Sequence, residues 1–281
     1  MFDFRLHVFH RVASRLNFTR AAEELFITQP AVTKHIRELE QQFSTKLFER
    51  NGTRIKLTAA GELLLHYTGE LFTVYRNLEF EMSSFTHKRS GVLRIGASTT
   101  AAQYILPPVL AAFHKKYRDV QVTLTINNTE HIGQALQNKE IELGIIEGQS
   151  KKSGVKYTAF VKDGIVLVSN IKNHLAAKHS IKPAELKKIP LLLREPGSGT
   201  LEVIANALKP HGIKISQLQS EMRLGSTESM KRYLLHSGCM AFISIHAVLK
   251  ELQQKECCII EIKGVDIERY FYFIQLQGQK E

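Results

Sequence analysis

Short runs rich in hydroxyl and amide side chains lie between predicted strands and the helices that follow them. Because ligands of open α/β sheets bind beyond the carboxyl ends of the strands, such runs can converge on one site. The free N–H groups and the dipole of a helix N-terminus attract anions. The sequence therefore predicts a site for a small anion or a carboxylate, and the four runs cover residues 96–100, 127–129, 195–200 and 225–228.

One acidic residue, Glu147, follows another predicted strand and belongs to the same candidate site. It would repel an anion unless it takes a proton or points away. We expect the hydroxyls of the first and third runs to face each other across a cleft and to hold the anion without direct contact from Lys or Arg. The alternative is that these hydroxyls only cap helices. The candidate ligand-binding residues are Ser98, Thr99, Thr100, Asn128, Thr129, Glu147, Ser198, Thr200 and Ser226.

The other reactive side chains form no recognisable catalytic or metal-binding pattern. Gly197 and Gly199 lack the third glycine of a dinucleotide fingerprint, and no P-loop is present. His7 and His10 would provide only two ligands, which are too few for a zinc site. The three cysteines include no Cys-x-x-Cys pair. We expect buried or half-buried thiols, no catalytic residue, no metal and no cofactor, and therefore no enzyme. A triad formed in space by scattered histidines is the alternative.

The composition is that of a globular protein. Of the 281 residues, 43% are hydrophobic and 23% are charged, and this length suggests two or three domains. No apolar run approaches the roughly 18 residues that a membrane-spanning helix needs, and no signal peptide is recognisable, so we expect a cytoplasmic protein. The net charge of +11 favours a polyanionic partner, although residues 1–90 hold only 13 basic against 10 acidic side chains.

The first 57 residues predict three helices followed by a hairpin. Apolar residues at helical spacing indicate helices over 1–16, 20–26 and 29–43, the second with Thr19 as its N-cap. Asn51-Gly52 between two short extended runs indicates a tight hairpin turn. A hairpin directly after a helix-turn-helix is a wing. We therefore expect a winged helix-turn-helix DNA-binding domain over residues 1–58.

The third predicted helix offers polar side chains that can read DNA in the major groove. Gln29 can bind adenine through two hydrogen bonds, Pro30 can contact thymine methyl groups, and Lys34 can reach guanine or a phosphate. Basic residues of the wing suit the sugar-phosphate backbone or the minor groove. The candidate DNA-binding residues are Thr19, Arg20, Thr28, Gln29, Pro30, Thr33, Lys34, Arg37, Arg50, Thr53 and Arg54.

A long helix is predicted over residues 59–90, with an apolar stripe that includes Leu64, Leu71 and Leu78. A helix of this length has no element of its own region to cover the stripe, so we expect it to pair with a second copy. The alternative is that it packs on the C-terminal part of its own chain. A dimer would place two recognition helices on a palindromic operator.

Residues 91–281 alternate predicted strands and helices, which favours an α/β fold with mainly parallel strands. The segment is long enough for two lobes. We expect lobe 1 over about 91–161 and 267–281 and lobe 2 over about 162–266, together forming one effector-binding domain.

Several runs together resemble the N-terminal domain of LysR-type transcriptional regulators. They are FTRAAEEL at 18–25, TQPAVTKHIRELE at 28–40, LFER at 47–50 and LTAAG at 57–61. The resemblance implies a winged helix-turn-helix, a linker helix for dimerisation and a two-lobed effector domain like that of periplasmic binding proteins, with small molecules bound between the lobes. The chain departs from the family pattern at Phe43-Ser44 and Ala59, and we expect no final helix after Leu276, where the family commonly has one.

Residues 96–100 and 194–200 look most like the sulfur-metabolism branch of that family, which implies a sulfur oxyanion as one candidate effector. We therefore expect a sequence-specific regulator of LysR type that responds to a small, anionic effector. Its expected partners are double-stranded operator DNA, further copies of itself in a homodimer or homotetramer, and RNA polymerase, but no membrane. The alternative is a cytosolic small-anion-binding protein or an enzyme on the same two-lobed fold.

Overall fold

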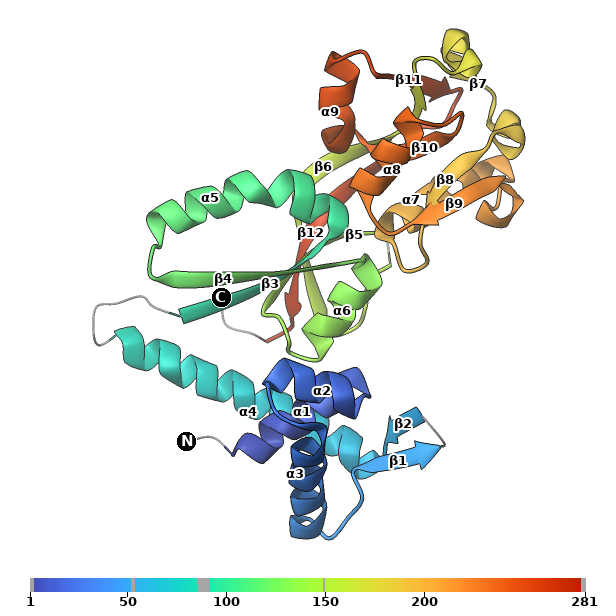
Figure 1. Ribbon diagram of the computed structural model, residues 1–281. Helices are drawn as coiled ribbons and strands as arrows, with labels where there is room; N and C mark the ends of the chain where they lie inside the picture. The colour runs from blue at the N-terminus through green and yellow to red at the C-terminus, as the bar shows by residue number, and fades with distance from the viewer. Residues whose placement is uncertain (1–2, 52–53, 85–90, 149, 279–281) are drawn as a thin grey trace. The chain divides into compact units, whose positions relative to one another are not determined.

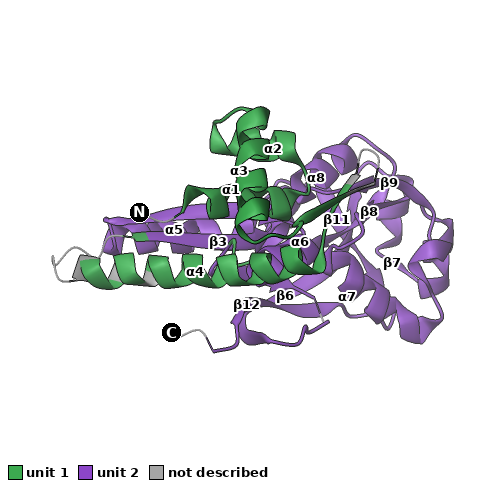
Figure 2. Ribbon diagram, turned by 90° about the horizontal axis from the view of Figure 1, so that it is seen from below, with its two compact units in different colours: residues 1–91, 138–140 green, residues 92–137, 141–281 purple. Residues whose placement is uncertain are grey.

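The computed structural model describes residues 3–51, 54–84, 91–148 and 150–278, and the chain divides into two compact units. Unit 1 comprises residues 1–91 with 138–140, and unit 2 comprises residues 92–137 with 141–281 (Figure 2). None of the described helices is long and apolar enough to cross a membrane.

Unit 1 begins with three helices around one apolar core: α1 (Phe4–Arg15), α2 (Phe18–Leu25) and α3 (Gln29–Gln42) (Figure 1). The N-cap of α2 is Asn17, whose side chain accepts from the Arg20 N–H at 3.0 Å, so the predicted cap at Thr19 is wrong. Thr28 caps α3. The buried core contains Val8, Phe9, Val12, Ala13, Ala21, Ala22, Val32, Ile36, Leu39, Leu47 and Phe48.

The predicted wing is present as an antiparallel pair, β1 (Phe48–Asn51) and β2 (Arg54–Leu57), and α4 (Ala59–Ser84) follows it. Thr58 joins the two parts, because its hydroxyl donates to the Lys46 carbonyl at 2.6 Å and accepts from the Gly61 N–H at 3.0 Å. A Cβ at Gly61 would lie 2.2 Å from the Leu47 carbonyl oxygen. Only glycine therefore lets the first turn of α4 pack this closely on the chain that leads into the wing.

Lobe 1 of unit 2 is a sheet with a helix on each face. Its elements are β3 (Gly91–Ser98), a π-helical turn (Ala101–Ile105), α5 (Leu106–Lys116), β4 (Val120–Asn127), α6 (Thr129–Gln137), β5 (Leu143–Glu147) and β12 (Glu268–Leu276). The strands lie in the order β4-β3-β5-β12. Ile145 of β5 packs on the α5 side and Ile146 on the α6 side, as expected for successive residues of a strand.

Lobe 2 shares the long strand β6 (Val155–Asn170) with lobe 1, because β6 pairs with β12 along its first half and with β10 and β11 along its second half. The further elements are β7 (Ser180–Ile181), β8 (Leu191–Arg194), α7 (Gly199–Leu208), β9 (Ser220–Leu224), α8 (Thr227–Leu235), β10 (Met240–Ser244), α9 (Ile245–Gln253) and β11 (Cys257–Ile262). Four short 3-10 helices cover His174–Lys178, Pro183–Lys188, Lys209–His211 and Ile215–Gln217. The helix α7 packs on Leu191 and Leu193, whereas α8 and α9 pack with Leu192 on the opposite face.

The prediction of mainly parallel strands fails at the strands that join the lobes. β6 is antiparallel to β10, β11 and β12, and β12 is antiparallel to β5. In the sequence, the longest continuous apolar run of β6 covers only residues 165–168. The first half of β6 carries exposed polar residues such as Lys156 and Thr158 between apolar ones, so it lacks the continuous apolar run of a buried parallel strand.

The cysteines lie in lobe 2, where Cys239 and Cys257 are buried and Cys258 is half-buried, as expected. Burial raises the pKa of the Cys239 and Cys257 thiols to about 11. These two side chains are therefore protonated at neutral pH and act as small apolar groups of the core.

Candidate functional site

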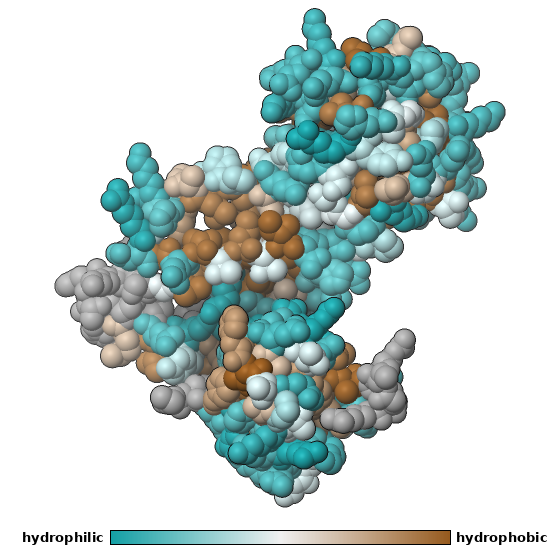
Figure 3. Space-filling view, in the orientation of Figure 1, coloured by the Kyte–Doolittle hydropathy of each residue, from teal (hydrophilic) through white to brown (hydrophobic). Residues whose placement is uncertain are grey.

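The exposed face of α3 brings five of the eleven predicted DNA-binding residues together. A shallow surface groove is lined by Gln29, Pro30, Thr33, Lys34, Arg37, Glu38 and Gln41. The surface over α3 is mainly hydrophilic (Figure 3). Val32, Ile36 and Leu39 point the other way into the core, which fixes the rotation of the helix. The polar face is therefore held outward by the packing of the apolar one.

Hydrogen bonds within α3 pre-order some of these side chains. The Gln29 amide donates to the Thr33 hydroxyl at 3.2 Å, and that hydroxyl donates to the Gln29 carbonyl at 3.1 Å. The Lys34 ammonium lies 3.9 Å from a Glu38 carboxylate oxygen and its side chain is 76% exposed. A pair this exposed is weak, so a phosphate can compete for Lys34 at little cost.

Two further candidates, Thr19 and Arg20, are exposed in the first turn of α2, and Thr28 is exposed at the start of α3. The wing candidates are less well defined. Arg50 and Arg54 occupy β1 and β2, but their side chains, like the whole of Thr53, lie outside the described residues.

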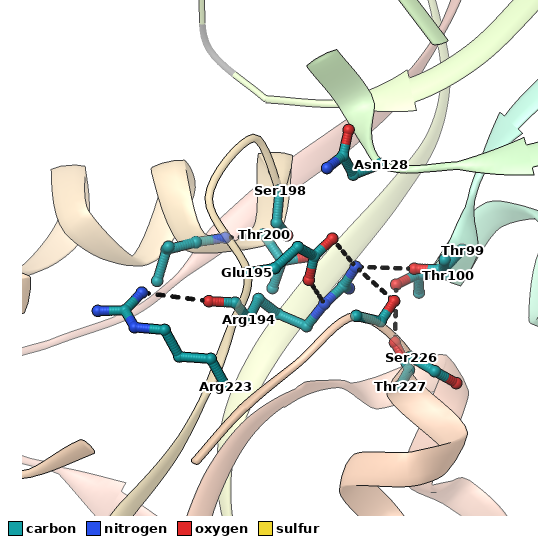
Figure 4. A network of polar contacts seen from close by, with 12 residues as sticks. Thr99, Thr100, Asn128, Arg194, Glu195, Ser198, Thr200, Arg223, Ser226 and Thr227 are labelled. Carbon is teal, nitrogen blue, oxygen red and sulfur yellow. Dashed lines mark hydrogen bonds and ion pairs between the residues drawn. The ribbon is translucent and has the colours of Figure 1, made fainter. Parts of the chain in front are cut away.

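The candidate effector site is centred on Arg194, the last residue of β8, which the sequence did not single out. Its side chain lies in a network formed by loops of both lobes (Figure 4). Its Nη2 donates to the Thr99 hydroxyl of lobe 1 at 3.0 Å and to the Gly225 carbonyl at 3.3 Å. Glu195 accepts from its Nε at 2.8 Å and from its Nη2 at 3.0 Å. The loops therefore surround a basic side chain, which the expectation of an anion held by hydroxyls and N–H groups alone did not include.

Arg194 nevertheless retains one free donor. The residue is 3% exposed, and its Nη1 is buried with no hydrogen-bond partner among the described residues. A buried guanidinium N–H that lacks a partner is costly, and an anion is the partner that guanidinium groups bind best.

Thr100 connects the lobes directly, because its hydroxyl lies 3.3 Å from that of Thr227, and both residues are buried. The serines of the predicted runs have a different role. Ser98, Ser198 and Ser226 each accept a 3.4 Å hydrogen bond from the backbone N–H three residues later. For these three hydroxyls the helix-cap alternative describes the observed contacts.

The remaining run, at Asn128 and Thr129, contacts the loop before α7. Asn128 Nδ2 donates to the Pro196 carbonyl at 3.2 Å, and Thr129 donates to the Glu147 carbonyl at 2.9 Å (Figure 4 shows Asn128). A Cβ at Gly199 would lie 2.0 Å from the Glu147 carbonyl oxygen. The first turn of α7 in lobe 2 therefore touches the end of β5 in lobe 1.

A buried charge network lies beside this contact. Arg269 Nε donates to Asp163 at 2.7 Å, and its Nη1 donates to the Thr200 hydroxyl at 2.7 Å and lies 3.4 Å from Glu147. Thr200 in turn donates to Glu147 Oε1 at 3.1 Å. Asp163 is in β6 and Arg269 is in β12, the two strands that join the lobes.

A second polar network ties the π-helical turn before α5 to α8 and α9. The Tyr104 hydroxyl bonds to Glu228, and the buried Lys231 ammonium lies 3.0 Å from Glu228 and 2.7 Å from Glu251. Burial and then the bond to Glu228 raise the pKa of Tyr104. Burial opposes ionisation of Glu228, but the bonds from Tyr104 and Lys231 lower its pKa overall. The Glu228 carboxylate is thus charged at neutral pH and accepts from both lobes.

Three residues of these networks are absent from the predicted ligand-binding set: Arg194, Thr227 and Arg269. A signal existed for Arg194, since a charge directly after Leu191–Leu193 has to be paired if the strand is buried. Thr227 follows the predicted Ser226 in the same run. Arg269 gave no local signal, because its partners are more than 60 residues away in the sequence.

Comparison with known families agrees with this architecture. A model described as "Bacterial regulatory helix-turn-helix protein, lysR family" matches residues 4–62, and one described as "LysR substrate binding domain" matches residues 86–281. The chain belongs to the LysR family of transcriptional regulators. This confirms the family and the fold class that the motifs and the helix-strand pattern predicted.

Curated relatives of this LysR-family chain are named as transcriptional regulators. The HTH-type transcriptional regulator CysL of Bacillus subtilis is 29% identical over 96% of this chain and 89% of its own length. A probable RuBisCO transcriptional regulator of Synechocystis is 31% identical over 94% of this chain and 78% of its own length.

Solved structures resemble both parts of the chain. The regulatory domain of Synechocystis CcmR, solved in complex with 2-PG, is 28% identical with a TM-score of 0.61, over 68% of this chain and 90% of that one. The fold of full-length CbnR in complex with its target DNA matches all of this chain and 95% of that one, with a TM-score of 0.63 at 20% identity. Full-length OxyR of Pseudomonas aeruginosa gives a TM-score of 0.68 at 17% identity, over 98% of this chain and 89% of its own.

The contact at Gly199 predicts how the lobes depend on each other. Gly199→Ala puts a methyl group against the Glu147 carbonyl, so the lobes have to separate and lose the hydrogen bonds across their contact. We expect the free energy of unfolding to fall by about 1–3 kcal/mol, measured by urea denaturation. Gly238→Ala is the control, since a Cβ there meets nothing within 4 Å. Equal stability of the two variants would contradict the close contact.

Proposed function

We propose that this LysR-family regulator reads its operator with the exposed face of α3. The observation that supports this is the groove in which Gln29, Thr33, Lys34 and Arg37 lie together at the surface. Gln29 and Lys34 would contact base edges, whereas Arg20, Arg37 and the wing arginines would contact phosphates. We place the DNA-binding domain at 1–58, the linker helix at 59–90 and the effector-binding domain at 91–281, and the two family matches support this division.

Substitutions on α3 and α2 should affect DNA binding differently. Gln29→Ala should reduce the preference for the promoter fragment over unrelated DNA by about 1–3 kcal/mol, because a two-bond contact to a base is lost. Arg20→Ala should weaken binding to both DNAs equally and lower the salt slope by about one. Gel-shift titrations at several salt concentrations measure both effects. An unchanged preference in Gln29→Ala would show that this face does not enter the groove.

We further propose that α4 pairs with a second copy of itself. Leu63, Tyr67, Leu71, Val74, Leu78 and Met82 form one stripe along the helix, and each is at least 45% exposed. The residues recur at intervals of three and four, which is the spacing of a helix-helix seam. Leu64, which the sequence assigned to the stripe, instead packs against the core of unit 1. A dimer gives two recognition helices and a palindromic operator.

A tetramer, and contact with RNA polymerase, remain expectations of the family resemblance.

The paired helices can be separated by charge. Leu71→Glu combined with Leu78→Glu places carboxylates in the seam, so the protein should become monomeric at micromolar concentration and lose most of its operator affinity. Sedimentation velocity measures the mass. Glu79→Ala, on the same helix but outside the stripe, should leave the oligomer intact. A double variant that sediments as the parent does would exclude this seam.

We propose that the effector presents an anionic group to Arg194 between the lobes. The free Nη1 of Arg194 carries this proposal, with the hydroxyls of Thr99, Thr100 and Thr227 beside it. A carboxylate, a phosphate and a sulfur oxyanion all meet this requirement. Binding at Arg194 would also stabilise the contact between the lobes, because Thr99 and Thr100 belong to lobe 1 and Arg194 and Thr227 to lobe 2.

Removal of one hydroxyl tests the effector site. Thr100→Val keeps the shape but loses the bond to Thr227 and any bond to the anion, so the affinity for an effector should fall about tenfold. Thr123→Val, on the exposed part of β4, is the matched control. Thermal-shift titrations with sulfate, thiosulfate, phosphate and small carboxylates identify a responding anion and give its affinity. Equal affinities in the two variants would place the effector elsewhere.

A further inference from the structure

One large apolar side chain of unit 1 is almost fully exposed to solvent. Phe26, the residue that ends α2, is 96% exposed, compared with 65% for Val74 and 59% for Leu63 on α4. The next residue, Ile27, instead packs against the core of unit 1. The turn between α2 and α3 therefore directs the Phe26 ring away from the protein, which leaves its apolar surface in contact with water.

The backbone of Phe26 also has a conformation that a bulky residue disfavours. Its φ of 54° and ψ of 38° lie in the left-handed region, and its N–H donates to the Glu23 carbonyl at 3.2 Å. Glycine is the usual residue at such a helix end, because it has no Cβ to clash. Glycine at position 26 would also expose no apolar ring. Two features that cost stability therefore meet in one residue, and the folding of the turn requires neither.

Phe26 lies beside the helix that we propose reads the operator. Thr28 is the N-cap of α3 and Gln29 is its first residue, so Phe26 precedes the proposed base contact by only three residues. Three residues of chain span at most about 11 Å. The N-terminal end of a recognition helix enters the major groove, so an outward side chain this close to it is within reach of base edges.

An aromatic ring without polar atoms has one specific partner in the major groove. The Phe26 ring has no hydrogen-bond donor or acceptor, so it cannot bind the polar edge of a base, but it can bury the C5-methyl group of thymine. Contact with the phosphates would place the ring against charged oxygens, which lose their hydration and gain no hydrogen bond in return. The chemistry of the ring therefore favours a thymine methyl group over the DNA backbone.

We propose that Phe26 contacts a thymine methyl group of the operator and is a specificity-determining residue outside α3 itself. This inference rests on the proposed reading of DNA by α3 and adds one base contact to it. The ring becomes buried when DNA is bound, which explains why the free protein carries it on the surface.

Phe26→Gly separates stability from DNA binding, because the two should change in opposite directions. The melting temperature should rise by about 2–4 °C, since glycine adopts the left-handed backbone without strain. The affinity for the promoter fragment, measured by fluorescence anisotropy, should fall at least about fourfold, the loss expected for one methyl group that is no longer buried. A lower melting temperature would show that the ring stabilises the fold, and the proposal would then be overturned.

Leu16→Gly is the matched control. Leu16 ends α1 with a φ of 46° and is 46% exposed, and α1 carries none of the candidate DNA-binding residues. This variant removes the same kind of strain and an exposed apolar side chain, so it should gain stability and bind DNA as the parent does. An equal loss of affinity in Leu16→Gly would show that the effect of Phe26→Gly is not a lost base contact.

Removal of the methyl group from the DNA is the sharper test, since it leaves the protein unchanged. Each thymine of the promoter fragment is replaced in turn by uracil, which lacks only that methyl group. At the contacted position uracil should weaken binding by the parent about fourfold and leave binding by Phe26→Gly unaffected. The proposal is overturned if no uracil weakens the parent, or if the same uracils weaken Phe26→Gly equally, because Pro30 would then contact the methyl group.

Two further outcomes would also overturn the proposal. If Phe26→Gly weakens binding to the promoter and to unrelated DNA equally, the ring contacts the DNA backbone. If the variant instead sediments at a different mass, a second copy covers the ring. Gln29→Ala tests the proposed function separately: a lost preference there without any uracil effect excludes only the role of Phe26, whereas an unchanged preference excludes the α3 face itself.

Discussion

The buried guanidinium of Arg269 is the contact on which the two-lobed unit depends. It comes from β12, binds Asp163 of β6, and reaches Thr200 at the start of α7 and Glu147 at the end of β5. One side chain therefore joins β6 and β12 to α7 of lobe 2 and to β5 of lobe 1. A charge this deeply buried is tolerated only when its partners are correctly placed, so the network favours a single arrangement of the lobes. The loops around Arg194 take their positions from that arrangement.

Local patterns made the DNA-binding unit easy to predict and the effector unit harder. In α3 the N-cap, the proline in the first turn and the apolar spacing are all within one helix, so the rotation of Gln29 and Lys34 followed from the sequence. The hydroxyl runs were also found, because each sits between a strand and a helix. The role of Arg194 between the lobes was missed because Thr99 and Gly225 are 95 and 31 residues away in the chain, although its other partner, Glu195, is adjacent. The first half of β6 was missed because polar residues interrupt it, and the pairing with β12 that stabilises it is equally remote.

Curated relatives with this framework are named as different transcriptional regulators. The CysL relative and the RuBisCO regulator of Synechocystis are 29% and 31% identical to this chain, so overall similarity does not separate them. If the effector binds between the lobes, as we propose, its choice depends on the few side chains that present free donors and acceptors there. Among the described residues, the buried side-chain atoms without a partner include Arg194 Nη1, Arg269 Nη2 and Glu147 Oε2. The helix caps around them are generic, whereas these three atoms define a specific pattern of charge.

The position of β12 has a consequence for biosynthesis. This strand lies between β5 and β6 in the sheet of lobe 1, yet more than 95 residues of lobe 2 separate it from β6 in the chain. During translation lobe 1 therefore emerges from the ribosome with a gap in the middle of its sheet, and the edges of β5 and β6 stay unpaired until residues 268–276 are made. Lobe 2 can complete most of its own pairing earlier. Lobe 1 should thus be the last part of the unit to fold, and its open strand edges are where a nascent chain is most exposed to misassociation and to chaperones.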